Sequence, residues 1–189
     1  MIRLFVALAL PETAQMRLAS LDGGVPGARW VKPQHRHLTL RFIGEVDRGI
    51  ADDLDIALGG IEAPSFELTL SGIGHFGKPD AARTLWAGVE PNGALDYLQS
   101  KVEAAAMRAG LPAEQRRFSP HVTLARLRHA PGNRVEQFVA DHAGFRAPPI
   151  TIDRFTLFSS FLSASGAIYT PEAEYPLAGQ METDYAGAL

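Results

Sequence analysis

The chain has 189 residues, of which 46% are hydrophobic, and it contains no cysteine. Such a length and apolar content can bury a sizeable core, in one domain or in two tightly joined lobes, and they argue against intrinsic disorder. The formal net charge of −3 excludes the overall basic character of a tight duplex-DNA binder. The lack of cysteine excludes disulfides, thiolate metal sites and a cysteine nucleophile.

The first eleven residues contain an arginine followed by an apolar run and therefore resemble a short signal peptide. The apolar run, residues 4–10, lies at the lower limit for such peptides, so we predict a core strand instead. No apolar run in the sequence approaches the length that crosses a bilayer. We therefore expect a soluble cytoplasmic protein.

Apolar periodicity and turn-forming residues predict strands and helices that alternate irregularly along the chain. The predicted helices are residues 12–21, 48–58, 94–108 and 135–141, and the predicted strands are residues 2–10, 29–32, 37–43, 66–73, 85–89, 119–127, 150–158 and 167–169. This order indicates an α+β or α/β fold without a clean β-α-β period. No Pro/Ser-rich linker divides the chain, so we expect one body, residues 1–189, with a flexible tail from about residue 179.

The pattern His-x-Thr-x occurs twice, each time inside a predicted strand. Side chains alternate between the two faces of a strand, so His37 shares a face with Thr39, and His121 with Thr123. Each copy therefore presents an imidazole and a hydroxyl above an apolar floor. The copies are separated by about the span of one small α/β lobe, which predicts two related lobes that each contribute one histidine. Two facing histidines suit acid–base chemistry on a phosphodiester.

Basic residues gather around both copies of the pattern. Residues 29–41 hold four basic residues and no acidic one, and residues 115–134 hold five and no acidic one. This distribution favours a local positive potential around an anionic substrate over a chance solvated surface.

Other patterns are weaker. Residues 72–77 match G-x-G-x-x-G, but Pro79 and the strand that follows leave no room for the helix of a dinucleotide site, so we interpret them as a glycine loop bordering the site. His35 and His37 are expected to form a His-x-His pair on one strand face, a spacing that can bind a metal, although no carboxylate lies close by in sequence. Isolated histidines are usually surface residues, and we assign no role to His75, His129 and His142.

The segments HLTLRFIGEV and FSPHVTLARL resemble the two signature motifs of the 2H phosphoesterase superfamily. The likeness is closest to the bacterial and archaeal RNA 2′,3′-cyclic phosphodiesterases, also known as 2′-5′ RNA ligases, and it extends to the opening RLFVAL strand, Trp30 and Val31, and the TLWAGV strand. It implies a bilobal α+β fold in which two pseudo-symmetric lobes have antiparallel sheets lining a central cleft and helices outside. It also implies hydrolysis of RNA 2′,3′-cyclic phosphate ends to 2′-phosphate ends, with no cofactor.

By this resemblance, His37 donates a proton to the leaving 3′ oxygen and His121 accepts one from water, while Thr39 and Thr123 bind the non-bridging oxygens. An imidazole pKa near 6.5 suits both roles at neutral pH, and the scheme requires no metal. The same chemistry, with a 5′-hydroxyl in place of water, would give reversible 2′-5′ ligation. The implied partner is RNA with a 2′,3′-cyclic phosphate end, tRNA-like or oligonucleotide, and we expect a monomer that does not bind membranes.

The resemblance also assigns phosphate binding to Arg126, which follows the second motif. In a regular strand Arg126 would lie on the opposite face from His121, so it reaches the site only if the strand twists, bulges or ends just before it. After the first motif, Arg41 has the same parity as His37, whereas Phe42 has the parity of the core and is expected to pack there.

Three alternatives stay open. Another 2H enzyme could act on a small cyclic phosphate from nucleotide or ADP-ribose metabolism, which substrate competition would separate from RNA hydrolysis. A non-catalytic module could hold RNA ends with its basic rim, and it would bind without turnover. A metal-dependent hydrolase could use His35 and His37, and a chelator would abolish its activity.

Overall fold

The computed structural model describes residues 1–164 and 166–179, so the predicted tail lies, from residue 180 on, outside the described residues. The helices are α1 (Glu12–Ala19), α2 (Arg48–Gly59), α3 (Gly93–Arg108) and α4 (Gly132–Asp141), with 3-10 turns η1 (Pro33–His35) and η2 (Pro79–Ala81). The strands are β1 (Ile2–Ala9), β2 (Ala28–Trp30), β3 (His37–Val46), β4 (Phe66–Leu68), β5 (Leu70–Phe76), β6 (Thr84–Val89), β7 (His121–Leu127), β8 (Ile150–Ile152), β9 (Arg154–Ser163) and β10 (Gly166–Pro176).

An eight-stranded antiparallel sheet organises the fold, in the order β10-β9-β1-β3-β7-β6-β5, with β2 paired to β7. β1 lies between β3 and β9, and its residues Leu4, Val6 and Leu8 are at most 1% exposed. The prediction of a core strand at the start of the chain is therefore confirmed. β4 and β8 form a separate two-stranded sheet.

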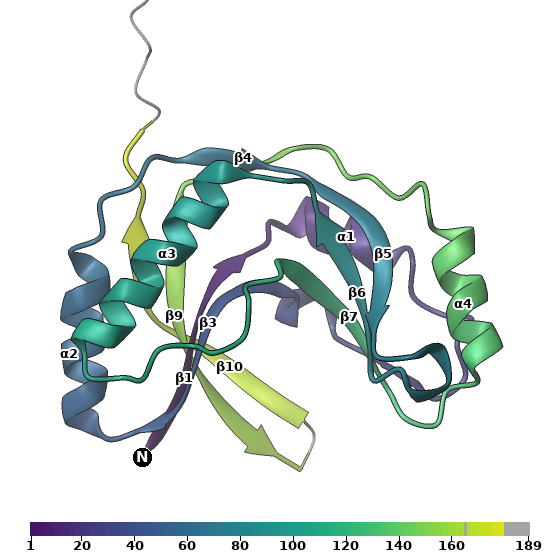
Figure 1. The fold of residues 1–189 in the computed structure, drawn as a ribbon, viewed down its shortest axis with the longest axis horizontal. Coiled ribbons are helices and arrows are strands. Elements are labelled where there is room, and N and C mark those ends of the chain that lie inside the picture. Colours follow the sequence, from purple (N-terminus) through teal and green to yellow (C-terminus); the bar gives the residue numbers. More distant parts are fainter. Residues whose placement is uncertain (165, 180–189) are drawn as a thin grey trace, which may run out of the picture.

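The large sheet has two halves that meet at Leu38 of β3 and Val122 of β7, which we call the central pair. β1, β9 and β10 continue the sheet on the β3 side, and β6 and β5 continue it on the β7 side. α2 and α3 lie together beside the first half, and α4 lies at the opposite end of the molecule (Figure 1). The predicted α+β fold with two lobes is therefore confirmed. The two lobes are interleaved in sequence, and their strands join in one sheet at the central pair.

Polar caps and apolar faces explain the two helices beside the first half. Asp47 Oδ1 accepts a hydrogen bond from Ile50 N at the start of α2, and Asn92 Oδ1 accepts one from Leu95 N at the start of α3. These caps satisfy first-turn amides that have no partner within the helix. The helix predicted at residues 94–108 is confirmed as α3, and the apolar face of its helical period is buried through Leu95, Leu98, Val102 and Ala105. No helix in the described part of the chain is long and apolar enough to cross a membrane.

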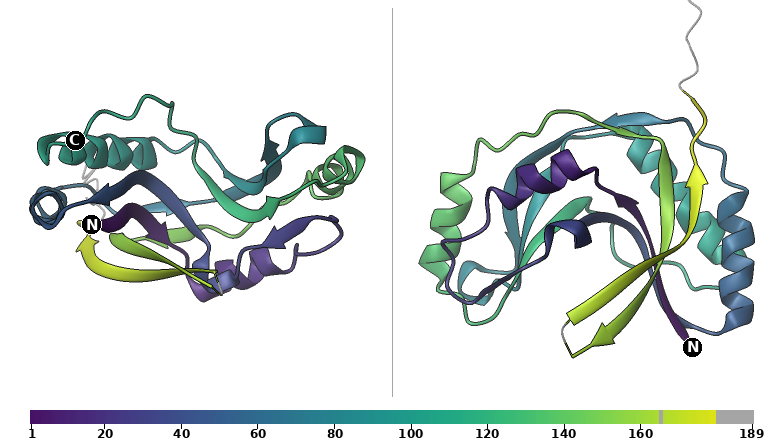
Figure 2. Two further views of the ribbon diagram at one scale, coloured as in Figure 1. Left: turned by 90° about the horizontal axis from the view of Figure 1, so that it is seen from below. Right: turned by 180° about the vertical axis from the view of Figure 1, so that it is seen from behind.

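Two regions differ from the sequence prediction. The strand predicted at residues 66–73 is interrupted at Thr69, and β5 continues to Phe76 through part of the predicted loop. The strand predicted at residues 150–158 is divided at Asp153 into β8, which pairs with β4, and β9. β9 and β10 extend beyond their predicted ends and form a hairpin that projects from the sheet (Figure 2). Phe161 and Leu162 are adjacent in the hairpin and both 68% exposed. With neither face buried at its tip, the hairpin has no alternating apolar pattern that a sequence reading could detect.

Candidate active site

The two His-x-Thr-x copies come together where the halves of the sheet meet. Because the central pair has an antiparallel register, His37 lies across from Thr123 and Thr39 lies across from His121. All four side chains are partly exposed, whereas the central pair beneath them is fully buried. The predicted sharing of faces is therefore confirmed. The two histidines are diagonal neighbours, which in a regular pair are about 7–8 Å apart, a separation that one phosphate group can bridge.

Each histidine has the same hydrogen bond on its inner nitrogen. Nδ1 of His37 lies 2.7 Å from the carbonyl oxygen of His35, and Nδ1 of His121 lies 2.7 Å from the carbonyl oxygen of Ser119. A carbonyl oxygen only accepts hydrogen bonds, so each Nδ1 carries the hydrogen. Nε2 is therefore the nitrogen that remains free to accept or donate a proton.

Aromatic side chains from three strands surround His37. The Phe5 ring is stacked with the imidazole at a centroid distance of 4.8 Å, the Tyr169 ring meets it edge-on at 5.4 Å, and the Phe158 ring lies at 6.3 Å. These rings hold the imidazole plane in one orientation and exclude water from its faces. Sequence reasoning missed them, because they come from β1, β9 and β10, far from the motif in sequence.

Two further aromatic residues lie against His121. The Phe76 ring meets the imidazole edge-on at 4.8 Å, and the Trp86 ring lies at 6.4 Å. Trp86 rests on Gly74, where an added Cβ would come within 2.4 Å of the indole ring. Close packing thus requires this glycine of the G-x-G-x-x-G segment, and β5 runs on past it where a dinucleotide site would have a helix. The prediction that the segment borders the site is confirmed through Phe76.

Burial lowers the pKa of both histidines below the usual value, because desolvation disfavours the charged imidazolium. The carbonyl groups of His35 and Ser119 oppose this effect, since they accept a hydrogen bond from the protonated ring. The positive charge of Arg126 lowers the pKa of both His37 and His121 further. Arg126 is therefore close enough to act electrostatically on the whole site.

A β-bulge explains how Arg126 reaches this face. β7 has two consecutive buried residues, Leu124 and Ala125, where β6 has one, Leu85. The extra residue reverses the alternation of side chains, so Arg126 is exposed on the face of His121. Arg126 thus reaches this face through a bulge, one of the three ways that the sequence analysis allowed.

β3 has the same irregularity after the first motif. Leu40 and Arg41 are both buried, and only Arg41 has a partner, Val6, in the register with β1. Phe42 consequently emerges on the face of His37 and is 44% exposed, while Arg41 turns to the opposite side. The predictions that Arg41 shares the face of His37 and that Phe42 packs in the core are therefore wrong, because strict alternation ends at the bulge.

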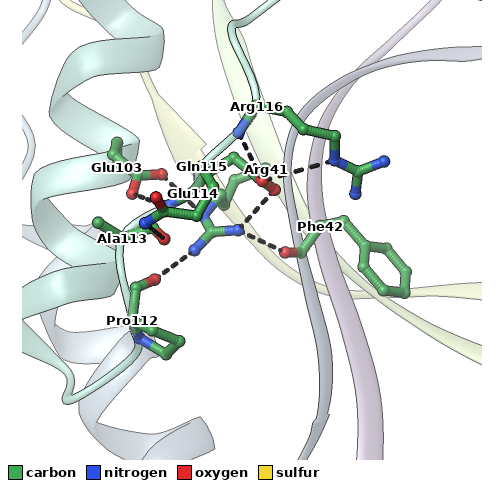
Figure 3. Close-up of polar contacts among 8 residues, drawn as sticks. All are labelled: Arg41, Phe42, Glu103, Pro112, Ala113, Glu114, Gln115 and Arg116. Atoms are coloured by element: carbon green, nitrogen blue, oxygen red, sulfur yellow. Dashed lines mark hydrogen bonds and ion pairs between the residues drawn. The ribbon is translucent and has the colours of Figure 1, made fainter.

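Arg41 instead forms a buried polar network (Figure 3). Its Nε lies 2.7 Å from Glu103 Oε2 in α3, and its Nη1 lies 3.2 Å from Glu114 Oε2. Nη2 donates a 2.7 Å hydrogen bond to the carbonyl oxygen of Pro112, and Nη1 donates one of 3.0 Å to that of Phe42. Arg41 thereby fastens the segment that precedes the second motif to β3 and α3.

The predicted His-x-His pair does not lie on one strand face. His35 ends the 3-10 turn η1, and only His37 belongs to β3. Within residues 1–164 and 166–179, no group of three or more His, Cys, Asp or Glu side chains is placed to hold a metal ion. The hydroxyl groups of Thr39 and Thr123 have no hydrogen-bond partner among the described residues, so they are available to a ligand.

Comparisons with known proteins agree with this geometry. The family model described as LigT-like phosphoesterase matches residues 8–86 and 88–169. RNA 2′,3′-cyclic phosphodiesterases from Thermotoga maritima and Thermus thermophilus are 31% and 34% identical to this chain, over 88% and 94% of its length and 91% of each relative.

A solved Thermus thermophilus structure has a TM-score of 0.74 at 29% identity, with 95% of this chain and 100% of that chain covered. Escherichia coli LigT in complex with 3′-AMP has a TM-score of 0.73 at 29% identity, with 93% and 98% covered. The matched family model spans both histidine motifs and most of the chain. This protein belongs to the LigT-like phosphoesterase family.

Proposed function

We propose that this protein hydrolyses RNA 2′,3′-cyclic phosphate ends to 2′-phosphate ends. The observation that carries the proposal is the diagonal pair His37 and His121, each with a free Nε2 on one face of the sheet. Membership of the LigT-like phosphoesterase family and the relatives named RNA 2′,3′-cyclic phosphodiesterase support the substrate class. Both histidines come from one chain, so a monomer suffices.

In-line displacement at phosphorus needs a proton acceptor and a proton donor on opposite sides of the phosphate. In our scheme Nε2 of His121 takes a proton from water as the water oxygen bonds to phosphorus. The bond from phosphorus to the 3′ oxygen breaks, and Nε2 of His37 protonates that oxygen. The products are a 2′-phosphate monoester and a 3′-hydroxyl, and no metal or cofactor takes part. The same displacement with a 5′-hydroxyl in place of water gives 2′-5′ ligation at the same site, again with release of the 3′-hydroxyl.

The lowered pKa values fit this scheme once substrate is bound. Burial lowers the pKa of His121 and so favours the neutral form that a general base needs. His37 must be protonated to act as the acid, although burial lowers its pKa in the free protein. An anionic phosphate between the two rings favours the charged form of both. The negative charge of the bound substrate therefore favours the protonated form of His37, and solvent supplies the proton.

Thr39, Thr123 and Arg126 stabilise the charge that develops on the phosphate in this scheme. The hydroxyl groups of Thr39 and Thr123, which have no partner in the described part of the chain, donate hydrogen bonds to non-bridging oxygens, and the guanidinium of Arg126 supplies a positive charge. Arg126 is oriented by Thr84, whose Oγ1 accepts a 3.3 Å hydrogen bond from Nη1.

The test is incubation of the purified protein, in excess EDTA, with a short RNA that ends in a 2′,3′-cyclic phosphate. We expect the 2′-phosphate product. His37→Ala and His121→Ala should each lower kcat about 10²- to 10⁴-fold while the protein stays folded, and Thr39→Ala and Thr123→Ala should cost less. A 3′-phosphate product would mean that the 2′ oxygen leaves instead of the 3′ oxygen. Binding without turnover would contradict the proposal.

A further inference from the structure

Arg29 of β2 lies directly beside Arg126 on the active face. The register of β2 with β7 pairs Arg29 with Arg126 and pairs the next residue, Trp30, with the buried Ala125. Paired residues in a sheet point to the same side, so Arg29 shares the face that the bulge gives to Arg126. Trp30 points to the other side, where its ring lies 5.6 Å from the ring of Phe138 in α4.

This arrangement of two cations is unfavourable without a ligand. Like charges directly opposite each other in a sheet repel, and neither Arg29 nor Arg126 has an ion-pair partner among residues 1–164 and 166–179. The Arg29 guanidinium extends toward the β9–β10 hairpin, because a Cβ added to Gly166 would lie 3.9 Å from its Nη2. Tyr169 of the same hairpin contacts the ring of His37. Arg29 therefore extends from β2, beside β7, toward the hairpin that contacts the ring of His37.

The position of Arg29 relative to the reaction identifies a ligand. Arg29 and Arg126 lie beyond the row formed by His37 and Thr123, on the side away from His121. In the proposed function water attacks from the side of His121, so the ribose and the rest of the RNA lie on the side of His37. Arg29 thus lies on the side of the reacting phosphate toward which the rest of the bound RNA chain extends.

We infer that Arg29 binds the phosphodiester that joins the terminal nucleotide to the preceding one, next to the cyclic phosphate held by the two motifs. This inference rests on the proposed function and deepens it. Arg29 is a binding residue that selects RNA over nucleoside 2′,3′-cyclic phosphates, which lack this second phosphate. Arg126 binds the reacting cyclic phosphate, and Arg29 binds the adjacent internucleotide phosphate.

The test compares Arg29→Ala with the wild-type protein on three substrates: a short RNA with a 2′,3′-cyclic phosphate end, the same RNA with an uncharged methylphosphonate at the last internucleotide linkage, and a nucleoside 2′,3′-cyclic phosphate. We expect KM for the RNA to rise roughly 10- to 100-fold, as for a lost charge-assisted hydrogen bond, with kcat unchanged. The variant should match the wild type on the other two substrates, which lack the charge that Arg29 binds. Its salt dependence on RNA should also weaken by about one phosphate contact.

Arg48→Ala is the matched control, since it removes one exposed arginine at the start of α2, at the far end of the molecule (Figure 1). It should leave all three substrates unaffected. Equal losses on the RNA and on the nucleoside cyclic phosphate would place Arg29 at the reacting phosphate and overturn the inference, as would no loss on any substrate. Failure of the wild-type protein to hydrolyse any of the three would instead reject the proposed function.

Discussion

Replacing Arg41 with glutamine should destabilise the protein without weakening substrate binding. The Arg41 side chain is 9% exposed and pairs with Glu103 and Glu114, which are 20% and 29% exposed. Removing one partner of a buried ion pair costs about 3–5 kcal/mol. Water can reach the two carboxylates left behind, so we expect the lower end, about 3 kcal/mol, which corresponds to a fall in Tm of roughly 6–12 °C.

The assay combines thermal and denaturant unfolding with kinetics on the cyclic-phosphate RNA, well below the unfolding midpoint. Arg126→Gln is the matched control, because it removes an equal charge from the equivalent stretch of the second motif. It should change the free energy of unfolding by no more than about 0.5 kcal/mol, as an exposed position does, and lower kcat/KM. Glu114→Gln should destabilise less than Arg41→Gln, since it removes one arm of the network.

The opposite pattern would refute this reasoning. If Arg41→Gln left Tm unchanged and raised KM for the RNA, Arg41 would face the substrate, as strict alternation along the strand predicts. The bulge at Leu40 and Arg41 would then be absent in solution. If Arg126→Gln lowered Tm and spared activity, the bulge in β7 would be absent as well.

Further predictions concern pH, a buried ion pair and a close contact. Because burial lowers the pKa of both active-site histidines in the free protein, both limbs of the pH profile of kcat/KM should lie below the usual histidine pKa of about 6.5. The pH profile of kcat should lie at higher pH, because the bound phosphate favours the charged imidazolium. An optimum of kcat/KM above about pH 6.5 would contradict this prediction. Asp22→Ala should cost about 1.5–3 kcal/mol in unfolding experiments, because it deprives the buried Arg36 of its carboxylate, and Asp22→Asn should cost less; equal costs would contradict the ion-pair role. Gly74→Ala should lower the free energy of unfolding by about 1–3 kcal/mol and lower kcat, because the added methyl group displaces Trp86. Gly93→Ala, where a Cβ meets nothing within 4 Å, should do neither. Unfolding and kinetic measurements that do not distinguish the two variants would contradict the close contact.

The reacting residues were predictable because their signal is local. His37 and Thr39 share a face by the two-residue period of a strand, and so do His121 and Thr123. No knowledge of the partner strand is needed for this inference. The apolar face of α3 was predictable for the same reason, since a helical period is also contained within one segment.

The environment of those residues was not predictable, because it depends on partner strands. The bulges at Leu40 and Leu124 exist only relative to the register with β1 and β6, so the sequence alternation alone misplaced Arg41 and Phe42. The ring of Phe158 meets the site from a strand more than a hundred residues away from the first motif. Such contacts have no periodic signature at the motif itself.

The two motifs also differ in how the chain holds the carbonyl oxygen that fixes each histidine tautomer. After Ser119, the ring of Pro120 fixes its own φ and restricts the preceding residue to extended conformations, so local covalent structure suffices. At the equivalent place in the first motif stands Arg36, whose buried Nη2 lies 2.7 Å from each carboxylate oxygen of Asp22 and whose Nε and Nη2 donate to the carbonyl oxygen of Val31. One tautomer thus depends on a proline and the other on an ion pair with a residue fourteen positions earlier. The two histidines therefore share one hydrogen-bond geometry at Nδ1, but different interactions hold that geometry in the two motifs.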